Sequence, residues 1–254
     1  MNKIKVSIIT VSYNSENTIE SCIKSVLSQT YNNIEYIIID GNSNDNSINI
    51  INKYKKSISK ILIEDDRGVY DAMNKGISIS SGEIVGFLNS DDFFANSESI
   101  SSLTEFIQLN NLDGCFGNIC YVDNKYPDKI KRKWISSEYV SGSFSYGWAP
   151  PHPTFYIKRK IYELYGCFNL KFSIAADFEL MLRFIEINKI NIKFFPHNLV
   201  FMRLGGISNK SIINILKQNY EIWKAIRESN LKFNFINFIN YKLKNRYIQF
   251  WGIE

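Results

Sequence analysis

Short apolar runs alternate with amphipathic stretches over the first part of the chain. The runs are continuous rather than alternating in polarity, as expected for strands that are buried on both faces of a sheet. They span Val6–Val11, Ile34–Ile39, Ile61–Ile63 and Ile84–Leu88. Between them, apolar residues recur at the spacing of one helical face. Regular alternation of strand and helix predicts an α/β fold, with a mostly parallel, Rossmann-like sheet and helices on both of its faces.

Polar residues follow each of these predicted strands. Parallel sheets bind ligands outside the carboxyl ends of their strands, so these residues should form one strand-end rim. The rim collects Thr10 to Asn14, Asp40, Asp65-Asp66-Arg67 and Asp91-Asp92. Carboxylates are hard ligands for Mg²⁺ or Mn²⁺, and they cannot contact a diphosphate without a cation between them. The rim therefore favours a nucleotide diphosphate held through a metal, although Asp91 or Asp92 could instead cap the helix that begins near Ser97.

Several other classes of protein are disfavoured by the sequence. There is no G-x-G-x-x-G after the first strand and no G-x-x-x-x-G-K-[ST] motif. The net charge of +5 comes from scattered residues except near the C-terminus, which argues against nucleic acid. We find no stretch that predicts a membrane span or a signal peptide, and we expect a cytoplasmic protein. The cysteines lack C-x-x-C spacing and are interpreted as buried thiols.

Four motifs, taken in this order, resemble those of a known enzyme family. They are VSIITVSYN at Val6–Asn14, IDGNSND at Ile39–Asp45, GVYDAMNKGI at Gly68–Ile77 and FLNSDD at Phe87–Asp92. Over about residues 4–210 the sequence resembles the inverting glycosyltransferases of family 2, which have the A-type glycosyltransferase fold. The third motif is similar to the branch that makes exopolysaccharides and O-antigens.

This resemblance implies transfer of a sugar from a nucleotide diphosphate sugar, usually a uridine diphosphate sugar, to a hydroxyl of a saccharide or lipid-linked saccharide. It implies a nucleotide pocket lined by Thr10, Val11, Ser12, Asn14, Glu16, Asp40, Asp66, Arg67, Asn74 and Asp91. Asp40 would read the base. The first position of the family's Asp-x-Asp motif is Asn89 here, which brings no charge. The Mn²⁺ or Mg²⁺ ion is therefore assigned to Asp91 and Asp92.

A second informative stretch begins at Ala175. As a helix it would place Glu179, Arg183 and Glu186 on one polar stripe, with Asp177 on the opposite side. An inward-pointing carboxylate at a helix start is either a cap or a working group. The resemblance implies that Asp177 is the catalytic base.

Two further segments have a functional and a structural interpretation. Three prolines surround His152, which in the resembled family borders the acceptor and diphosphate side; alone, it would be a structural hydrogen-bond donor. The glycines at 205–206 permit a loop that closes over the diphosphate with Arg203 or Ser208 on its oxygens. An ordinary turn is the alternative.

The C-terminal part has a different composition from the rest. We expect a catalytic domain over 1–210, with a nucleotide-binding half (1–110) and an acceptor half (111–210), followed by a helical, basic-aromatic extension over 211–254. On its last helix, one apolar face would be formed by Ile236, Ile239, Leu243, Tyr247 and Phe250. That face could bind the anionic inner surface of the cell membrane, form a homodimer contact or fold back on the core.

Two other functions remain open at this stage. A metal-dependent nucleotidyltransferase also uses carboxylates on a similar sheet, but its Gly-rich basic loop is missing after Val11. A non-catalytic nucleotide-sugar-binding domain would keep the strand-end rim and would not need Asp177.

Overall fold

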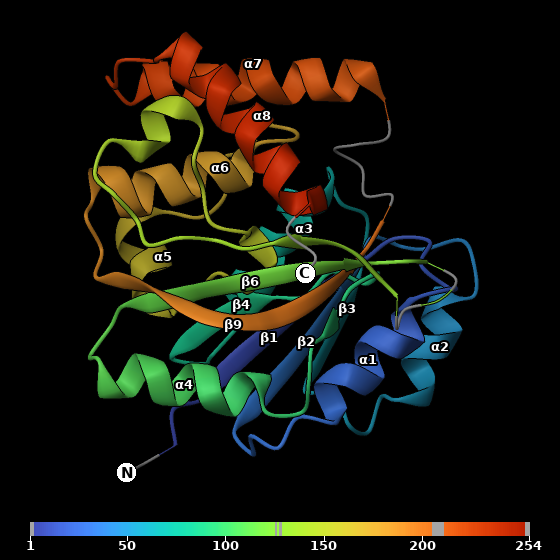
Figure 1. Ribbon diagram of the computed structural model, residues 1–254. Coiled ribbons are helices and arrows are strands. Elements are labelled where there is room, and N and C mark those ends of the chain that lie inside the picture. The colour runs from blue at the N-terminus through green and yellow to red at the C-terminus, as the bar shows by residue number, and fades with distance from the viewer. Residues whose placement is uncertain (1–2, 125, 127–128, 205–210, 252–254) are drawn as a thin grey trace.

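A nine-stranded sheet with helices on both faces organises the computed structural model (Figure 1). The structure describes residues 3–124, 126, 129–204 and 211–251. The strands are β1 (Val6–Ser12), β2 (Ile34–Asp40), β3 (Lys60–Ile63), β4 (Ile84–Phe87), β5 (Phe93–Phe94), β6 (Gly114–Val122), β7 (Ile130–Trp134), β8 (Tyr156–Lys158) and β9 (Ile192–Arg203). Their order in space is β3-β2-β1-β4-β8-β6-β9-β5, with β7 on β6.

The first four strands pair in parallel, as the sequence predicts. Ser12 lies opposite Asp40, and Asp40 lies opposite Ile63, so the carboxyl ends of β1, β2 and β3 are level. The sheet then changes direction, because β8 runs antiparallel to both β4 and β6 while β6 and β9 are parallel. The carboxyl ends of β1, β2 and β3 thus lie together at one end of the sheet, as predicted for the strand-end rim.

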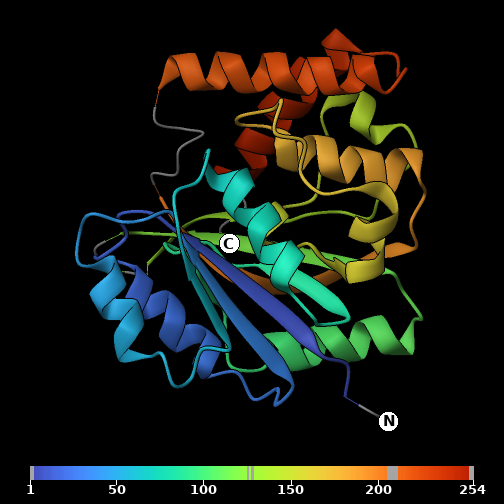
Figure 2. The same cartoon turned by 180° about the vertical axis from the view of Figure 1, so that it is seen from behind.

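Helices cover both faces of this sheet. One face carries α1, α2 and α4, and the other carries α3, α5 and α6 (Figures 1 and 2). The helices are α1 (Ile19–Leu27), α2 (Ser47–Lys53), α3 (Val69–Ile79), α4 (Ser99–Leu109), α5 (Arg159–Tyr165), α6 (Ala176–Met181), α7 (Ile212–Glu228) and α8 (Phe235–Trp251). Shorter turns are the 3₁₀ helices η1 (Ser143–Tyr146) and η2 (His152–Thr154) and the π-helical η3 (Leu182–Ile187).

Alternate side chains of each central strand enter two separate cores. On β1, Ile8 packs with the α1, α2 and α4 side, whereas Ile9 packs with the α3 and α6 side. Both side chains are fully buried. This explains the continuous apolar runs, since a strand covered on both faces has no position that faces water.

At the opposite end of the sheet from the rim, the buried carboxylate of Glu35 is the centre of a cluster of hydrogen bonds and ion pairs, called here the Glu35 cluster. Its carboxylate accepts from Ser7 Oγ at 2.6 Å and from the backbone and hydroxyl of Ser81, each at 2.7 Å. Lys5 and Lys60 reach the same carboxylate at 3.3 and 3.0 Å. Burial opposes ionisation of Glu35, but these donors outweigh it and hold its pKa below the ordinary value.

The C-terminal helices pack on the half of the sheet that follows β4. α7 contacts α6, and α8 contacts β7 and η1. Phe238 on α8 is buried against Gly147, and the Tyr241 ring lies 5.3 Å from that of Tyr146. Phe238 and Tyr241 thus pack one face of α8 on the core. The apolar face predicted from the sequence is a different one, and its residues Ile236, Ile239, Leu243 and Tyr247 are exposed. Within the described residues, no helix combines the length and apolar character needed to cross a bilayer.

Candidate active site

Hydrogen bonds between the loops after β1 and β2 build the first part of the strand-end rim. Asp40 is fully buried, and its two oxygens accept from the backbone N–H and the hydroxyl of Ser43, at 2.7 and 2.9 Å. The Ser43 hydroxyl in turn accepts from the Asn14 N–H at 2.9 Å. Asn14 Oδ1 accepts from the N–H of Asn44, also at 2.9 Å. The structure thus uses Asp40 to set the loop shape and keeps its carboxylate beneath the surface.

The remaining predicted pocket residues of β1 and of the loop after it differ in exposure. Thr10 and Val11 are buried in the two cores, and the Thr10 hydroxyl lies 3.2 Å from the Tyr36 hydroxyl. The Ser12 hydroxyl is buried and has no hydrogen-bond partner within the described part of the chain. Glu16 is exposed and accepts from the backbone N–H of Asn46 at 3.0 Å. Of these, only Glu16 is open to solvent.

The end of β3 comes directly against the end of β2. A Cβ on Gly41 would lie 2.4 Å from Asp66 Oδ2, so only glycine leaves room for this carboxylate. Asp66 Oδ1 accepts from the N–H of Gly68 at 2.8 Å. Arg67 is exposed and pairs with Asp71 at 2.9 Å. Asp66 therefore lies beside the Asp40 loop, and Arg67 projects from the rim.

Asn74 on α3 has both ends of its amide occupied by one residue. Its Nδ2 donates to the Phe168 carbonyl at 2.9 Å, and its Oδ1 accepts from the Phe168 N–H at 2.9 Å. Phe168 lies in the segment that leads to α6. Asn74 thus ties this segment to α3.

Asp91 and Asp92 occupy different environments. Asp92 is fully buried, and its Oδ2 accepts from Asn89 Nδ2 at 3.1 Å. Its Oδ1 is buried without a hydrogen-bond partner among the residues described. Burial, followed by the charge of Asp91, raises the pKa of Asp92 well above its ordinary value. Asp91 is half-buried at the rim, which makes it the better placed of the two for a ligand.

Arg203, at the end of β9, lies beside Asp91. Its Nη1 donates to the Asp91 carbonyl at 2.6 Å and its Nη2 to the Ser21 hydroxyl at 3.0 Å. The guanidinium also lies over the Phe93 ring, 5.0 Å from its centroid. Ser208, predicted on the same side, lies outside the described residues.

Asp177 lies in the first turn of α6 and is half-buried. Its Oδ1 accepts from the Phe178 N–H at 2.9 Å and from the Tyr70 hydroxyl at 3.0 Å. The same hydroxyl lies 2.9 Å from the Ile174 carbonyl. Burial and the charge of Asp177 raise the pKa of Tyr70 well above its ordinary value. The phenol therefore keeps its proton and acts as a donor beside the carboxylate.

His152 lies on the inner side of this group. Its ring stacks on Phe87, at the end of β4, at 5.4 Å, and meets Phe168 edge-on at 5.5 Å. Nε2 is buried and has no hydrogen-bond partner in the part of the chain that is described. Burial lowers the pKa of His152, against the opposing charge of Asp177. His152 is therefore a neutral imidazole at neutral pH.

A cleft of about 170 Å³ opens beside Arg67 and Tyr70. It lies between the start of α3 and the segment before α6. Its lining comprises Arg67, Gly68, Val69, Tyr70, Asp71, Leu170, Phe172 and Ser173. Tyr70 belongs both to this cleft and to the contacts of Asp177. Of the predicted site residues, Arg67 lines this cleft, and Tyr70 links it to Asp177 through the contact of its hydroxyl.

The residues fit a metal that is shared with a ligand. No group of three His, Cys, Asp or Glu side chains within the described ranges is arranged to hold an ion. Asp91 offers one half-buried carboxylate, and Mg²⁺ in nucleotide sites is held by one or two carboxylates together with substrate phosphates. A cation at this rim would therefore take most of its ligands from a bound diphosphate and from water.

Two contacts of the site were not predicted from the sequence. Tyr70 lies within the GVYDAMNKGI motif, and that motif was the available signal for it. Ser43 follows Asp40 by three positions, a spacing at which side-chain to backbone turns form. Both residues decide how a carboxylate of the site is oriented.

Comparison with known proteins places these features in a family. Residues 7–175 match the family described as Glycosyl transferase family 2. A PGL/p-HBAD biosynthesis glycosyltransferase of Mycobacterium bovis is 26% identical, over 80% of this chain and 78% of its own. The Escherichia coli enzyme UDP-Glc:alpha-D-GlcNAc-diphosphoundecaprenol beta-1,3-glucosyltransferase WfaP is 27% identical, over 92% of this chain and 75% of its own.

Solved structures agree on the fold. Staphylococcus aureus TarS, in complex with UDP-GlcNAc, superposes with a TM-score of 0.71 at 18% identity, over 89% of this chain and 65% of that one. The mannosyltransferase PcManGT of Pyrobaculum calidifontis, in complex with GDP-Man and Mn²⁺, gives a TM-score of 0.66 at 17% identity, over 89% and 65%. The chain spans about two thirds of each solved chain and has their A-type glycosyltransferase fold.

Proposed function

The chain belongs to glycosyl transferase family 2, and we propose that it moves a sugar from a nucleotide diphosphate sugar to a hydroxyl of a saccharide acceptor, with inversion at the anomeric carbon. The observation that carries this proposal is the contact between Tyr70, which lines the cleft together with Arg67, and the carboxylate of Asp177. An inverting transfer needs a base that takes the proton of the acceptor hydroxyl, and a carboxylate beside the nucleotide-sugar site can be that base. Family membership disfavours the nucleotidyltransferase alternative.

The proposed donor is a uridine diphosphate sugar. One relative is named for UDP-Glc, and a solved structure of similar fold is a complex with UDP-GlcNAc. We propose that the nucleotide lies along the rim, over the predicted pocket residues. Asp40 reads the base only if its loop shifts, because its carboxylate is buried under Ser43. Asp66 and Glu16 are more accessible on the same edge.

We propose that Mn²⁺ or Mg²⁺ accompanies the donor and is held mainly by Asp91. When bound, such an ion neutralises charge on the leaving diphosphate. The buried Asp92 supports the turn that presents Asp91, through its bond with Asn89. Arg203 holds the Asp91 backbone and lies close enough to the rim to add positive charge on the diphosphate side. A solved structure of similar fold contains Mn²⁺.

Asp177 is the proposed general base. It takes the proton of the acceptor hydroxyl as that oxygen bonds to the anomeric carbon. The bond from the anomeric carbon to the diphosphate oxygen breaks in the same displacement, and the nucleoside diphosphate leaves. Tyr70 donates to Asp177 and orients the carboxylate, while the neutral His152 stacks on Phe87. One displacement of this kind inverts the sugar and forms no covalent intermediate on the protein.

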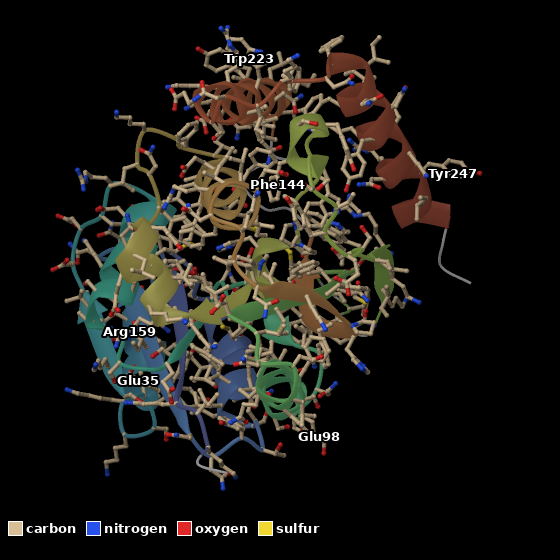
Figure 3. The ribbon with its side chains drawn as sticks, turned by 90° about the vertical axis from the view of Figure 1, so that its left-hand side faces the viewer. Glu35, Glu98, Phe144, Arg159, Trp223 and Tyr247 are labelled. Atoms are coloured by element: carbon tan, nitrogen blue, oxygen red, sulfur yellow. The ribbon has the colours of Figure 1, made fainter. Side chains whose placement is uncertain are left out.

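The proposed acceptor is a lipid-linked saccharide of bacterial surface polysaccharide synthesis. The Escherichia coli relative is named for a diphosphoundecaprenol-linked sugar. The outer face of α7 and α8 suits such a substrate, because apolar side chains on it are exposed. These are Ile212, Ile213, Leu216, Tyr220, Ile236, Ile239, Leu243 and Tyr247. Figure 3 shows Trp223 on α7 and Tyr247 on α8 at the periphery of the molecule.

Charge on these helices decides which partner we propose for the outer face. Residues 211–254 contain seven lysines and arginines and three acids. One of those acids, Glu221, is buried and faces inwards. An apolar face with a surplus of basic residues matches an anionic membrane surface, and repulsion would oppose a second copy of the same helices. We therefore propose peripheral attachment to the inner face of the cell membrane, with a homodimer as the alternative.

The test of this function is transfer by purified protein. It would be incubated with UDP-Glc, UDP-GlcNAc or UDP-Gal, with Mn²⁺, and with a synthetic lipid diphosphate-linked sugar. Mass spectrometry should detect an acceptor longer by one sugar, and NMR should show an anomeric configuration opposite to that of the donor. Binding of UDP without hydrolysis or transfer of any nucleotide sugar would instead favour the non-catalytic binding domain.

A further inference from the structure

A buried carboxylate on α7 holds the backbone just ahead of Asp177. Glu221 is 6% exposed. Its Oε1 accepts from the N–H and the hydroxyl of Ser173, at 3.1 and 2.8 Å. Its Oε2 accepts from the N–H groups of Ile174 and Ala175, both at 2.9 Å. Four donors from three consecutive residues thus converge on one side chain, two positions before Asp177.

This acid faces the interior of the protein. Glu221 lies on the same side of α7 as Ile222 and Ala225, which are buried in the core. An ionised carboxylate is costly in such a place unless it is hydrogen-bonded, and bonds to a charged acceptor are roughly twice as strong as neutral ones. Burial opposes ionisation of Glu221, yet the donors on Ile174 and Ser173 outweigh it and lower its pKa. The four bonds are therefore charge-assisted.

The segment that Glu221 holds is part of the proposed site. The Tyr70 hydroxyl lies 2.9 Å from the Ile174 carbonyl and 3.0 Å from Asp177 Oδ1, so both oxygens are within reach of its single proton. Ser173 lines the cleft. The charge of Glu221 also contributes to the raised pKa of Tyr70. A shift of this segment would therefore move one wall of the cleft and displace the Asp177 carboxylate relative to its donor, Tyr70 on α3.

We propose that Glu221 is a positioning residue for the base: it fixes residues 173–175 and thereby sets the orientation of Asp177 toward the acceptor hydroxyl. The proposal rests on the proposed role of Asp177. Glu221 itself touches no reacting group, because backbone and serine donors occupy both of its oxygens. α7 thus does more than cover the core, since one of its faces organises the site while the other is exposed.

Glu221→Gln tests this directly. The amide keeps the shape but turns one oxygen into an N–H donor that faces other N–H donors. We expect kcat to fall on the order of 10²-fold, the loss typical of a misplaced catalytic group. The KM of the nucleotide sugar and the Kd of UDP should stay within about twofold, because the rim is untouched. Glu228→Gln is the matched control, since Glu228 lies on the same helix and is exposed.

The decisive measurement repeats Glu221→Gln in an Asp177→Asn background. A residue that acts only through Asp177 should have no further effect on turnover once that carboxylate is gone. An equal loss of turnover in both backgrounds would overturn the proposal, because a structural defect acts whether or not the base is present. A rise in the KM of the nucleotide sugar alone would also contradict it.

Hydrogen exchange separates this inference from the proposed function. Exchange of the amides of residues 173–175 should be at least tenfold faster in Glu221→Gln and unchanged in Glu228→Gln, and this readout requires no activity. If exchange is faster in Glu221→Gln but Asp177→Asn keeps full turnover, Glu221 holds the segment and the base is misassigned. If exchange in Glu221→Gln is unchanged, Glu221 does not hold the segment and the proposal is refuted. If Glu221→Gln does not fold, Ser173→Ala removes one donor of the four. It should lower kcat severalfold only when Asp177 is present, and an equal loss in its absence would refute the proposal.

Discussion

The Tyr70 hydroxyl lies 3.0 Å from Oδ1 of Asp177, although the two residues are 107 positions apart in the chain. One comes from the first turn of α3 and the other from the first turn of α6. The contact joins the helix that follows β3 to the helix that carries the proposed base. Most of what the site is expected to do depends on this junction.

Tyr70→Phe removes only the hydroxyl from this junction. The Asp177 carboxylate then loses one of its donors, and a hydrogen bond to a charged group contributes about 1.5–3 kcal/mol. We expect kcat to fall by about tenfold or more, with the KM of the nucleotide sugar unchanged. Steady-state kinetics checks this, with Tyr126→Phe as the control on an exposed tyrosine. A full wild-type kcat would mean that the hydroxyl proton serves the Ile174 carbonyl instead.

Asp91→Ala should weaken the binding of UDP in the presence of Mn²⁺ by about tenfold or more, because the cation loses its proposed protein ligand. Calorimetry with Mn²⁺ and with EDTA measures the difference, which should vanish in the variant. Asp92→Asn is the informative comparison, since that side chain is buried and held by Asn89. It should retain metal-dependent binding. Loss in Asp92→Asn and retention in Asp91→Ala would reverse the assignment.

Glu35 predicts a pH dependence of stability. Its pKa is held below the ordinary value of 4.5 in the folded state, so its contribution is present above about pH 4.5 and is lost as the pH falls toward the folded-state pKa. Glu35→Gln should lower the free energy of unfolding at pH 7 by about 1–3 kcal/mol, because buried donors lose an acceptor. The difference from wild type should shrink below pH 4.5 in urea titrations.

Glu98→Gln is the control for this prediction, because Glu98 is exposed at the start of α4 (Figure 3). It should leave the free energy of unfolding nearly unchanged across the same pH range. If the free energies of unfolding of wild type and Glu35→Gln differ by the same amount from pH 7 to pH 3, the ionised Glu35 cluster is contradicted.

The outer face of α7 and α8 can be tested with vesicles. Leu216→Asn combined with Leu243→Asn should reduce sedimentation with phosphatidylglycerol vesicles by about tenfold, since both leucines are exposed on that face. Leu109→Asn with Leu164→Asn changes equally exposed leucines on α4 and α5, and should have no effect. Equal sedimentation of the two double variants would contradict membrane attachment. If the Leu216→Asn, Leu243→Asn variant instead loses a dimer in sedimentation velocity and still binds vesicles, the outer face is a homodimer contact.

Much of the fold could be predicted because it depends on local periodicity. The continuous apolar run of β1 requires two covered faces, and Ile8 and Ile9 do enter different cores. The strand-end rim follows from parallel pairing, which places Ser12 opposite Asp40. The antiparallel insertion of β8 and the π-helical turn after α6 were not predicted, because short segments with few distinctive residues carry little periodicity.

The candidate site was predictable by residue type and less so by orientation. The motifs indicated Asp40, Asn74 and Asp92 as pocket or metal residues. In the structure these three side chains are held by Ser43, Phe168 and Asn89, respectively. A motif shows which groups are near a ligand and does not show which way each one turns.

Glu221 illustrates a second limit of the sequence. Its partners are 46 to 48 positions earlier in the chain, a separation at which no local pattern links them. The one available sign was an acid on the inward side of an amphipathic helix, next to Ile222. Such contacts become visible only when the chain is folded.

The most direct test of the whole account is the turnover of Asp177→Asn, measured together with its affinity for UDP. Asparagine keeps the shape of the side chain and cannot take the proton of an acceptor hydroxyl. Loss of a positioned base costs about 10²–10⁴ in rate. We predict a loss of kcat in that range with the Kd of UDP within about twofold of wild type. Transfer at the wild-type rate would contradict the central claim that Asp177 is the base.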